Sequence, residues 1–449
     1  MNKKNISIVI LFMNFFVIFA VNFSLEYTQN VLTLSTDTVF SNAFQVGIEY
    51  SARDFQFWAT MYLSNDNKYP PFYPGYYGNY YFIMKDSGVE FSLNNNMNIK
   101  IGNFSNYDVI NSPYSLYLSS LGHSAPTVSF KYQDDKFIYE TRWILVSYES
   151  SPLLDKGMNF KYYAMKLGNV VVGYEEASVY VNRIFDVDYF INPLPSFFVQ
   201  YIREWGPFSE GWNDNSMMGF FIKYETLDKY LYAQMLVDDF NANRFFNPDN
   251  PTVDKIAWSL GGKFDFGIFS VGVYHAGATK YVFQPSDTKN EPLYYGYTYY
   301  TETLYTKYGQ EYIIDYLDNY IGYKYGENNL AFLGQFSMNF PFLNLYSDVE
   351  YVISGTKSPV NPWTESDTYT PGFNLLNDPL LEKSLFFRTK LEKYFDFVSV
   401  GVNFVSGIIW NKLELVEAND STKKPYFSPS NKTEQIFDLS LFFKFQFSL

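Results

Sequence analysis

Apolar and polar residues alternate with a period of two along much of this chain, and the pattern is clearest in the last stretch, Phe437 to Leu449. Every odd-numbered position there is apolar, and every even-numbered position except Phe442 is polar. A period of two places alternate side chains on opposite faces of a β-strand. A soluble sheet could not expose such an apolar strand at its edge without aggregating. The pattern therefore predicts the closing strand of a membrane β-barrel, with lipid on one face and a polar lumen on the other.

The same alternation returns in short segments from Ala43 onward, often as pairs joined by tight polar turns such as Asn94-Asn95-Asn96. These hairpins predict an all-β fold, a transmembrane antiparallel β-barrel of about 16 to 18 strands. Asn319–Tyr325 is counted among the strands, and Asp186–Ile191 is a further candidate strand. Three stretches rich in tyrosine, proline or glycine interrupt the pattern and are predicted as long external loops: Tyr69–Tyr81, Tyr294–Tyr316 and Gly355–Pro379.

Two other stretches depart from the two-residue period. Asn103–Ala125 has no clean period, and it is predicted to fold into the lumen or over a rim. From Pro193 to Trp205, apolar residues recur at helical spacing. This second stretch is predicted as a short loop helix that caps the barrel or enters it as an inward plug.

Composition favours a membrane barrel over a soluble enzyme. Charged residues make up 18% and aromatic residues 21% of the 449 residues. Aromatic girdles at the two membrane interfaces would account for the excess of rings. The chain has no cysteine, which excludes disulfides and thiolate metal sites and suits an export route. The net charge of -14 argues against nucleic acid as a partner.

Residues 1–24 are predicted to be a cleaved signal peptide. Two lysines precede an apolar run from Ile6 to Ala20, and cleavage is placed after Ala20 or Ser24. The alternative, a transmembrane anchor, would need a longer run, because about 20 apolar residues are required to span a bilayer. No other stretch approaches that length, so a helical membrane protein is excluded. Residues 25–449 are predicted to form a single barrel domain in the cell outer membrane.

Candidate catalytic groups are few, because the chain has only two histidines. His275 shares a face with apolar residues at a strand end, which is typical of a structural residue at the membrane interface. His123 lies beside Ser124, but adjacent residues seldom place a serine hydroxyl and an imidazole in catalytic geometry. The chain is therefore predicted not to be an enzyme, and no cofactor or metal is expected. An outer-membrane hydrolase is the weaker alternative.

Acidic and aromatic residues suggest two kinds of binding site. Asp238 and Asp239 begin an oxygen-rich stretch that could hold Ca²⁺, but its spacing matches no calcium loop, so a solvated turn is favoured. The aromatic loops combine tyrosine with polar residues, which suits glycans, because sugar C–H faces stack on rings while hydroxyls need donors and acceptors. A girdle at the membrane interface is the alternative for any single tyrosine. The candidate glycan-binding residues are Tyr73, Tyr76, Tyr77, Trp205, Trp212, Asp238, Asp239, Tyr295 and Tyr299.

Several short motifs resemble the capsule-assembly (Wzi-type) outer-membrane proteins. The motifs are Lys100-Ile101-Gly102-Asn103 followed by Ser115–Ser119 and Ala125-Pro126, then Asp214–Gly219 with Leu231–Phe240, and lastly Ile321–Asn328. The resemblance implies a barrel that holds exported polysaccharide at the cell surface. A Trp-Gly-Pro element at residues 205–207 comes later than its place in that family, and no N-terminal helical plug is evident.

The sequence thus predicts an outer-membrane β-barrel that binds or organises surface polysaccharide. Its expected partners are outer-membrane lipid, surface polysaccharide and the barrel-assembly machinery, since the apolar end at Leu449 resembles the C-terminal assembly signal of such barrels. The alternative is a general diffusion porin, whose polar lumen and acidic charge would favour small cationic solutes.

Overall fold

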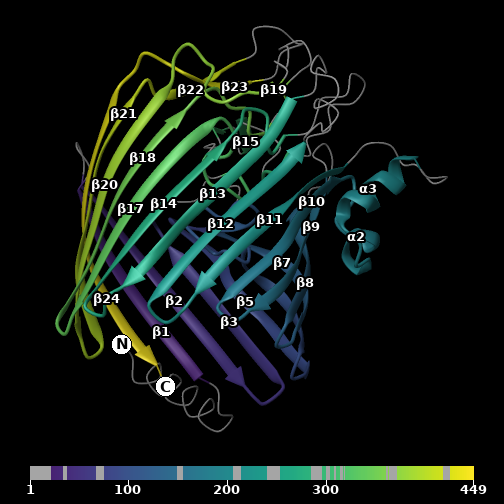
Figure 1. Cartoon of the computed structure of the whole chain (residues 1–449). Helices are drawn as coiled ribbons and strands as arrows, with labels where there is room; N and C mark the ends of the chain where they lie inside the picture. The colour runs from purple at the N-terminus through teal and green to yellow at the C-terminus, as the bar shows by residue number, and fades with distance from the viewer. Residues whose placement is uncertain are drawn as a thin grey trace.

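A computed structural model of the chain describes residues 22–33, 38–66, 75–148, 155–205, 214–239, 253–284, 296–299, 304–307, 310–313, 317, 319–360, 363, 372–417 and 425–448. Within these ranges, 18 wall strands form a closed antiparallel β-barrel, accompanied by two short helices (Figure 1). Each wall strand pairs with its neighbours in sequence order, and β1 closes the barrel by pairing with β24 from Ser24↔Ser448 to Thr33↔Leu439. The predicted fold class and strand number are confirmed.

The wall strands are, in order around the barrel, β1 (Asn22–Thr33), β2 (Thr38–Ser51), β3 (Phe55–Ser64), β5 (Tyr80–Asn94), β6 (Met97–Tyr107), β7 (Ser119–Gln133), β8 (Phe137–Ser147), β9 (Lys156–Leu167), β10 (Val170–Val181), β11 (Asp214–Glu225), β12 (Lys229–Asp239), β13 (Val253–Asp265), β14 (Phe269–Ala278), β17 (Asn329–Phe340), β18 (Leu343–Ser354), β20 (Glu382–Phe395), β21 (Val398–Trp410) and β24 (Glu434–Ser448). Short strands add local pairings: β4 (Gly75–Tyr77) on β5, β19 (Gly372–Phe373) parallel to the start of β13, β15 (Leu304–Lys307) with β16 (Gln310–Ile313), and β22 (Leu413–Val416) with β23 (Tyr426–Pro429).

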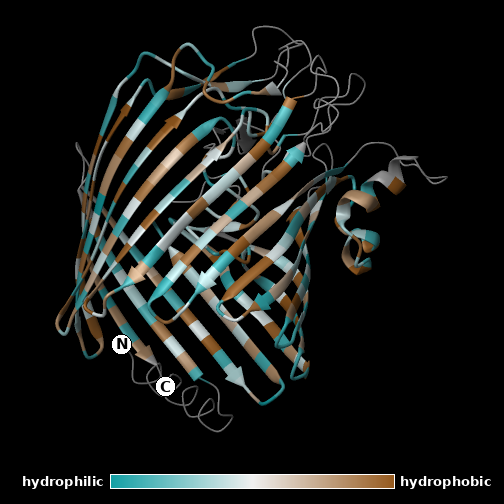
Figure 2. Cartoon of the chain, viewed as in Figure 1, coloured by the Kyte–Doolittle hydropathy of each residue, from teal (hydrophilic) through white to brown (hydrophobic). Residues whose placement is uncertain are grey.

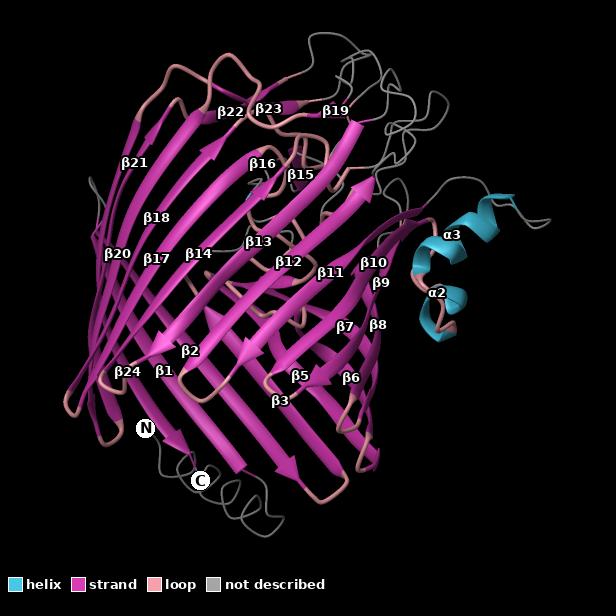
Figure 3. Ribbon diagram, viewed as in Figure 1, coloured by secondary structure: helices cyan, strands magenta, loops and turns pink. Residues whose placement is uncertain are grey.

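The two ends of the barrel differ in the length of their connections (Figure 3). Short turns, such as Asn95-Asn96 and Gly168-Asn169, lie at the end where β1 begins and β24 finishes. The long connections join strands at the opposite end, and the three stretches predicted as external loops belong to them. The prediction is wrong for part of Tyr294–Tyr316, because Tyr297 is buried in the lumen cluster. In barrels of the outer membrane, short turns face the periplasm and long loops face outward. Residues 1–21 of the predicted signal peptide lie outside the described residues, whereas its last three predicted positions, Asn22 to Ser24, belong to β1.

Apolar and polar positions alternate along the wall strands, and the outward positions form an apolar belt (Figure 2). On β24, Phe437, Leu441 and Phe443 are exposed on the outer face. Phe442, the one break in the sequence pattern, is buried on the lumen face, where its ring lies over Gly401 of β21. A Cβ atom at position 401 would lie 2.1 Å from that ring, so the glycine provides the space that Phe442 fills.

Two connections fold into the lumen. Residues 108–118, between β6 and β7, bury Tyr114 and Tyr117 completely. This is one of the two outcomes predicted for Asn103–Ala125, whose ends belong instead to β6 and β7. Residues 319–328 form a second buried loop that packs on the first, with Tyr323 N donating to Leu116 O over 3.2 Å. The strand predicted at Asn319–Tyr325 is therefore wrong, because this backbone pairs with other loops rather than with the wall.

The two helices lie in the connection between β10 and β11. α2 (Val187–Ile191) replaces the predicted strand, because the Asp186 carboxylate accepts the N–H groups of Asp188 and Tyr189 and caps a helix. α3 (Ser196–Trp205) is the predicted loop helix. It is neither a cap nor an inward plug, because both helices lie outside the wall, against β8, β10 and β11 (Figure 1). No helix among the described residues is long and apolar enough to cross a membrane.

Candidate functional site

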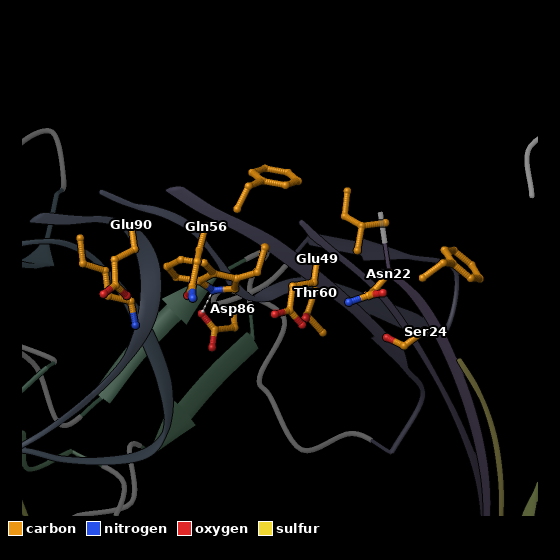
Figure 4. A pocket seen from close by; sticks show the side chains of 13 residues that line it. Asn22, Ser24, Glu49, Gln56, Thr60, Asp86 and Glu90 are labelled. Carbon is orange, nitrogen blue, oxygen red and sulfur yellow. Dashed lines mark hydrogen bonds between the residues drawn. The ribbon is translucent and has the colours of Figure 1, made fainter. Parts of the chain in front are cut away.

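The lumen has a filled side and an open side. The two lumen loops pack against inward residues of β7 to β18, whereas a cavity of about 730 Å³ opens along β1, β2, β3, β5 and β6. Its polar side chains project into the lumen (Figure 4). They are Asn22, Ser24, Glu49, Gln56, Thr60, Asp86, Glu90 and Lys100, together with the indole of Trp58. We call this cavity the wall groove.

Strand register brings these side chains together. Glu49 of β2 pairs with Trp58 of β3, and Gln56 of β3 pairs with Glu90 of β5, which in turn pairs with Lys100 of β6. Side chains of directly paired residues share one face of a sheet. The period of two that places Phe55 and Phe57 on the outer face of β3 therefore places Gln56 and Trp58 on the inner face.

Trp58 is the centre of the wall groove. Its indole N–H donates to Asp86 Oδ1 over 2.8 Å, which fixes the plane of the ring. Lys100 Nζ lies 4.7 Å from the Trp58 ring centroid and 4.0 Å from that of Phe104. Glu90 accepts a hydrogen bond of 3.1 Å from Asn98. The groove thus joins a fixed aromatic ring to carboxylate, ammonium, amide and hydroxyl groups, which are the elements of a site for a polyhydroxylated ligand.

The first lumen loop is held by a network of polar side chains. The Asp108 carboxylate accepts the backbone N–H groups of Ile110, Asn111 and Tyr117. Gln234 of β12 donates to both Asp108 and Glu175, over 2.9 and 2.7 Å, and accepts the N–H of Leu116.

Further contacts tie the loop across the barrel. The hydroxyl of Tyr114 donates to Glu350 of β18 over 2.8 Å. Burial raises the pKa of the Tyr117 phenol well above its ordinary value, so the hydroxyl stays neutral. These contacts fix the filled side of the lumen as a rigid surface.

The second lumen loop depends on a buried pair at the outer end of the barrel. Lys357 donates to the carbonyl oxygens of Tyr325 and Glu327. The Glu327 carboxylate accepts N–H groups from Tyr281, Ser358 and the Trp363 indole. Burial lowers the pKa of Lys357 to about 7, although nearby carboxylates act in the opposite direction. Burial also raises the pKa of Glu327.

The predicted glycan-binding residues belong to separate connections. Tyr77 of β4 is 89% exposed at the outer end. Tyr299 packs against the buried lumen cluster, and Asp238 is half-buried near the outer end of β12.

The side chains of the other six predicted glycan-binding residues lie outside what the structure describes. Tyr76 lies in β4, Trp205 ends α3 outside the wall, and Asp239 ends β12, and their side chains are not described. Tyr73, Trp212 and Tyr295 lie outside the described residues.

The histidines occupy different surroundings. His275 lies on the outer face of β14, where it accepts the Trp258 indole N–H over 3.2 Å and stacks on Phe332 with ring centroids 4.5 Å apart. His123 lies in β7, and its side chain is not described.

Sequence reasoning missed the wall groove. The available signal was an aromatic residue on the polar face of a strand, since Trp58 shares its face with Gln56 and Thr60 and alternates with the apolar residues of the other face. A tryptophan out of phase with the apolar face points to the lumen. The composition of the loops led instead to the prediction of a glycan site among tyrosines of the long connections.

Comparison with solved structures shows the fold. Wzi of Escherichia coli, an outer-membrane protein involved in group 1 capsule assembly and described as a carbohydrate-binding β-barrel, matches 95% of this chain and 85% of its own, with a TM-score of 0.54 and 10% identity. OccAB4 of Acinetobacter baumannii matches 96% of this chain and 98% of its own, and OprD of Pseudomonas aeruginosa matches 96% and 95%, both with a TM-score of 0.46 and 9% identity. No family model and no curated protein matches the sequence. The chain is similar in fold to barrels of the outer membrane.

Proposed function

We propose that this protein lies in an outer membrane and binds or organises surface polysaccharide, as the Wzi-type resemblance implies. The observation that carries the proposal is the divided lumen. Two rigid loops fill one side, and the open side presents an oriented tryptophan among polar groups. A lumen built for unselective diffusion gains nothing from a fixed ring, whereas a sugar chain needs both a stacking surface and hydrogen-bonding groups. The similarity in fold to a carbohydrate-binding barrel supports the same conclusion.

Two positions would contact the glycan. Trp58 offers a ring face in the wall groove, and Glu49, Asp86 and Lys100 offer hydrogen bonds to hydroxyl groups. Tyr77 offers an exposed ring at the outer end, where a surface polymer would arrive first. The remaining predicted loop residues would add to that outer site.

Binding to a panel of surface polysaccharides, with the full chain in lipid nanodiscs, tests this proposal. The native chain should retain at least one polymer, and Tyr77→Ala should weaken its retention. Absence of binding across the panel, or binding that Tyr77→Ala and Trp58→Ala both leave unchanged, would refute it.

A cation-preferring porin is the second candidate. The lining of the wall groove has three acidic side chains, Glu49, Asp86 and Glu90, and one basic side chain, Lys100. This excess of negative charge would attract small cations. Recording in a planar bilayer separates the two functions. A steady, large conductance by the native chain favours the porin, and a silent barrel favours the polysaccharide binder.

A further inference from the structure

The outer face of the wall is polar beneath the helices. Phe160, Tyr162 and Ala177 belong to the buried cluster of the lumen, so the alternate residues of β9 and β10 point outward. The outward residues of β8 to β11 in this region include Thr141, Asn159, Lys161, Glu176, Ser178 and Ser216. Hydrocarbon cannot solvate such groups, so a wall of this kind cannot contact lipid directly.

Residues 184–205, the α2–α3 segment, cover this polar area. Lys161 Nζ lies 3.7 Å from Glu176 Oε1, and it donates to the carbonyl oxygens of Asn192 and Leu194 over 2.8 and 3.3 Å. Glu176 accepts the backbone N–H and the hydroxyl of Ser196 over 2.7 and 2.8 Å. The inner face of the segment therefore satisfies the polar groups of the wall.

Nearer the outer end, α2 continues the same contact. The hydroxyl of Tyr189 donates to Asp214 over 2.7 Å, and its ring stacks on Tyr180 of β10 with centroids 5.8 Å apart. Thr141 of β8 donates to the carbonyl of Phe190 over 3.0 Å. Both helices are thus fastened to the wall over several strands.

The opposite face of the segment is apolar and uncovered. Its exposed apolar side chains include Phe185, Val187, Ile191, Leu194, Phe197, Phe198 and Ile202, and Asp188 in the first turn of α2 is an exposed charged residue beside them. Ile191 and Ile202 are 65% and 61% exposed. A helix in water would turn such residues inward, because removing apolar side chains from water is favourable. Here the inward positions are occupied by polar contacts instead.

The segment reaches the level of the apolar belt. The hydroxyl of Tyr163 donates to the Pro193 carbonyl over 2.9 Å, and β9 ends only four residues later, at Leu167. With a rise of about 3.3 Å per residue and a strand tilt of about 40°, Pro193 lies roughly 10 Å above the short-turn end, inside a belt about 25 Å tall. Directly beside it, an apolar groove of about 480 Å³ is lined by Phe137, Tyr163, Met165, Tyr174 and Phe220.

We propose that the α2–α3 segment is a membrane-embedded element of the barrel, whose outward face contacts lipid acyl chains. The groove beside it is lined by Met165 and Phe220, which are exposed on the outer face of the wall. The segment separates the polar patch of the wall from the lipid. Its inner face forms hydrogen bonds with the wall, and the apolar side chains of its outer face contact the acyl chains. This proposal does not depend on polysaccharide binding.

Spin labels on single cysteines test the proposal, because the native chain has no cysteine. Labels at Ile191→Cys and Phe198→Cys are compared in phosphatidylcholine vesicles with two controls. Val273→Cys reports the exposed outer face of β14, and Leu227→Cys reports the exposed turn between β11 and β12. Collision rates are measured with oxygen, which partitions into lipid, and with a water-soluble nickel complex.

Labels at 191 and 198 should resemble the label at 273, with frequent oxygen collisions and few nickel collisions. Nickel accessibility equal to that at 227 would overturn the proposal. Low accessibility to both reagents, together with dipolar coupling between labels, would also overturn the proposal. That result would mean that a second copy of the chain, and not lipid, covers the apolar face of the segment. Ile202→Cys replaces either variant that fails to fold, as judged by heat-modifiable electrophoretic migration.

Discussion

The ammonium of Lys161 lies 3.7 Å from the carboxylate of Glu176 on the outer face of the barrel, and their side chains are 0% and 1% exposed. A buried ion pair on the lipid-facing side of a transmembrane wall requires a cover, and the α2–α3 segment provides it. The same strands turn apolar side chains, such as Phe160 and Ala177, toward the lumen. The outer face of this part of the wall is therefore polar, while its inner face is mixed, because Glu140 and Glu175 point into the lumen beside Tyr162.

Breaking the Lys161–Glu176 pair should destabilise the barrel. Lys161→Met leaves Glu176 buried without its counter-ion, and the free energy of unfolding should fall by about 3 to 5 kcal/mol. Unfolding by guanidinium in vesicles measures the change. Lys161→Met combined with Glu176→Leu should recover much of the loss. Arg53→Met is the matched control, because the Arg53 side chain is 93% exposed, and its variant should unfold like the native chain.

A charge on the apolar face of the α2–α3 segment should also be unfavourable. Ile191→Arg would place a guanidinium among acyl chains, at a cost that approaches about 2 to 4 kcal/mol near the bilayer midplane. The same unfolding assay applies, with Leu227→Arg in the exposed turn as its control. Equal stability of the two arginine variants would mean that residue 191 faces water.

The buried lysine of the outer end predicts a dependence on pH. Burial lowers the pKa of Lys357 to about 7, while a lysine in the unfolded chain titrates near 10.4. Between these values the unfolded state binds more protons at this residue, so stability should rise with pH across the window, by on the order of 1 kcal/mol per pH unit at most. Below pH 7 both states are protonated and the dependence ends.

Lys357→Met isolates this contribution. Unfolding free energies at pH 7.5 and 9.5 should differ less in Lys357→Met than in the native chain, whereas Lys383→Met, at an exposed position of β20, should keep the native difference. Burial also raises the pKa of Glu327, and this shift has the opposite effect on stability, at pH values between the unfolded and the folded pKa of its carboxyl. An unchanged slope in Lys357→Met would contradict the account.

Removing the first lumen loop should open the barrel to ions. Residues 110–117 carry two of the buried rings of the filled side, Tyr114 and Tyr117, and a Gly-Ser linker in their place would leave the wall strands intact. Planar-bilayer recording should show a larger and steadier conductance for this variant than for the native chain. Equal conductance would mean that the loop does not limit passage.

The alternation of residues was sufficient to predict the fold class, the strand number and the closing strand. It could not predict which face of β9 and β10 points inward, because a period of two defines two faces without labelling them. Met158, Phe160 and Tyr162 look lipid-facing by polarity, yet they contact the lumen loops. Their direction depends on contacts with residues 108–118 and 184–205, which are distant in sequence.

The same limit applies to the candidate site. The polar face of β3 is visible in the sequence, but the position of Trp58 beside Asp86 depends on the pairing of β3 with β5 across a bulge near Thr60. The helical spacing after Pro193 predicted α3 correctly. The helix lies outside the wall because its segment covers Lys161 and Glu176, whose side chains point outward. The sequence does not reveal that outward direction.

Retention of surface polysaccharide by the wall groove tests the central claim most directly. Trp58→Ala removes the stacking ring, and Phe55→Ala, on the outer face of β3 and outside the groove lining, is the matched control. With both variants folded in nanodiscs, we expect Trp58→Ala to bind the polymer at least about tenfold more weakly than the native chain, a loss of about 1.4 kcal/mol, and Phe55→Ala to bind it equally well. Equal affinity of the native chain and Trp58→Ala would contradict a glycan site in the lumen.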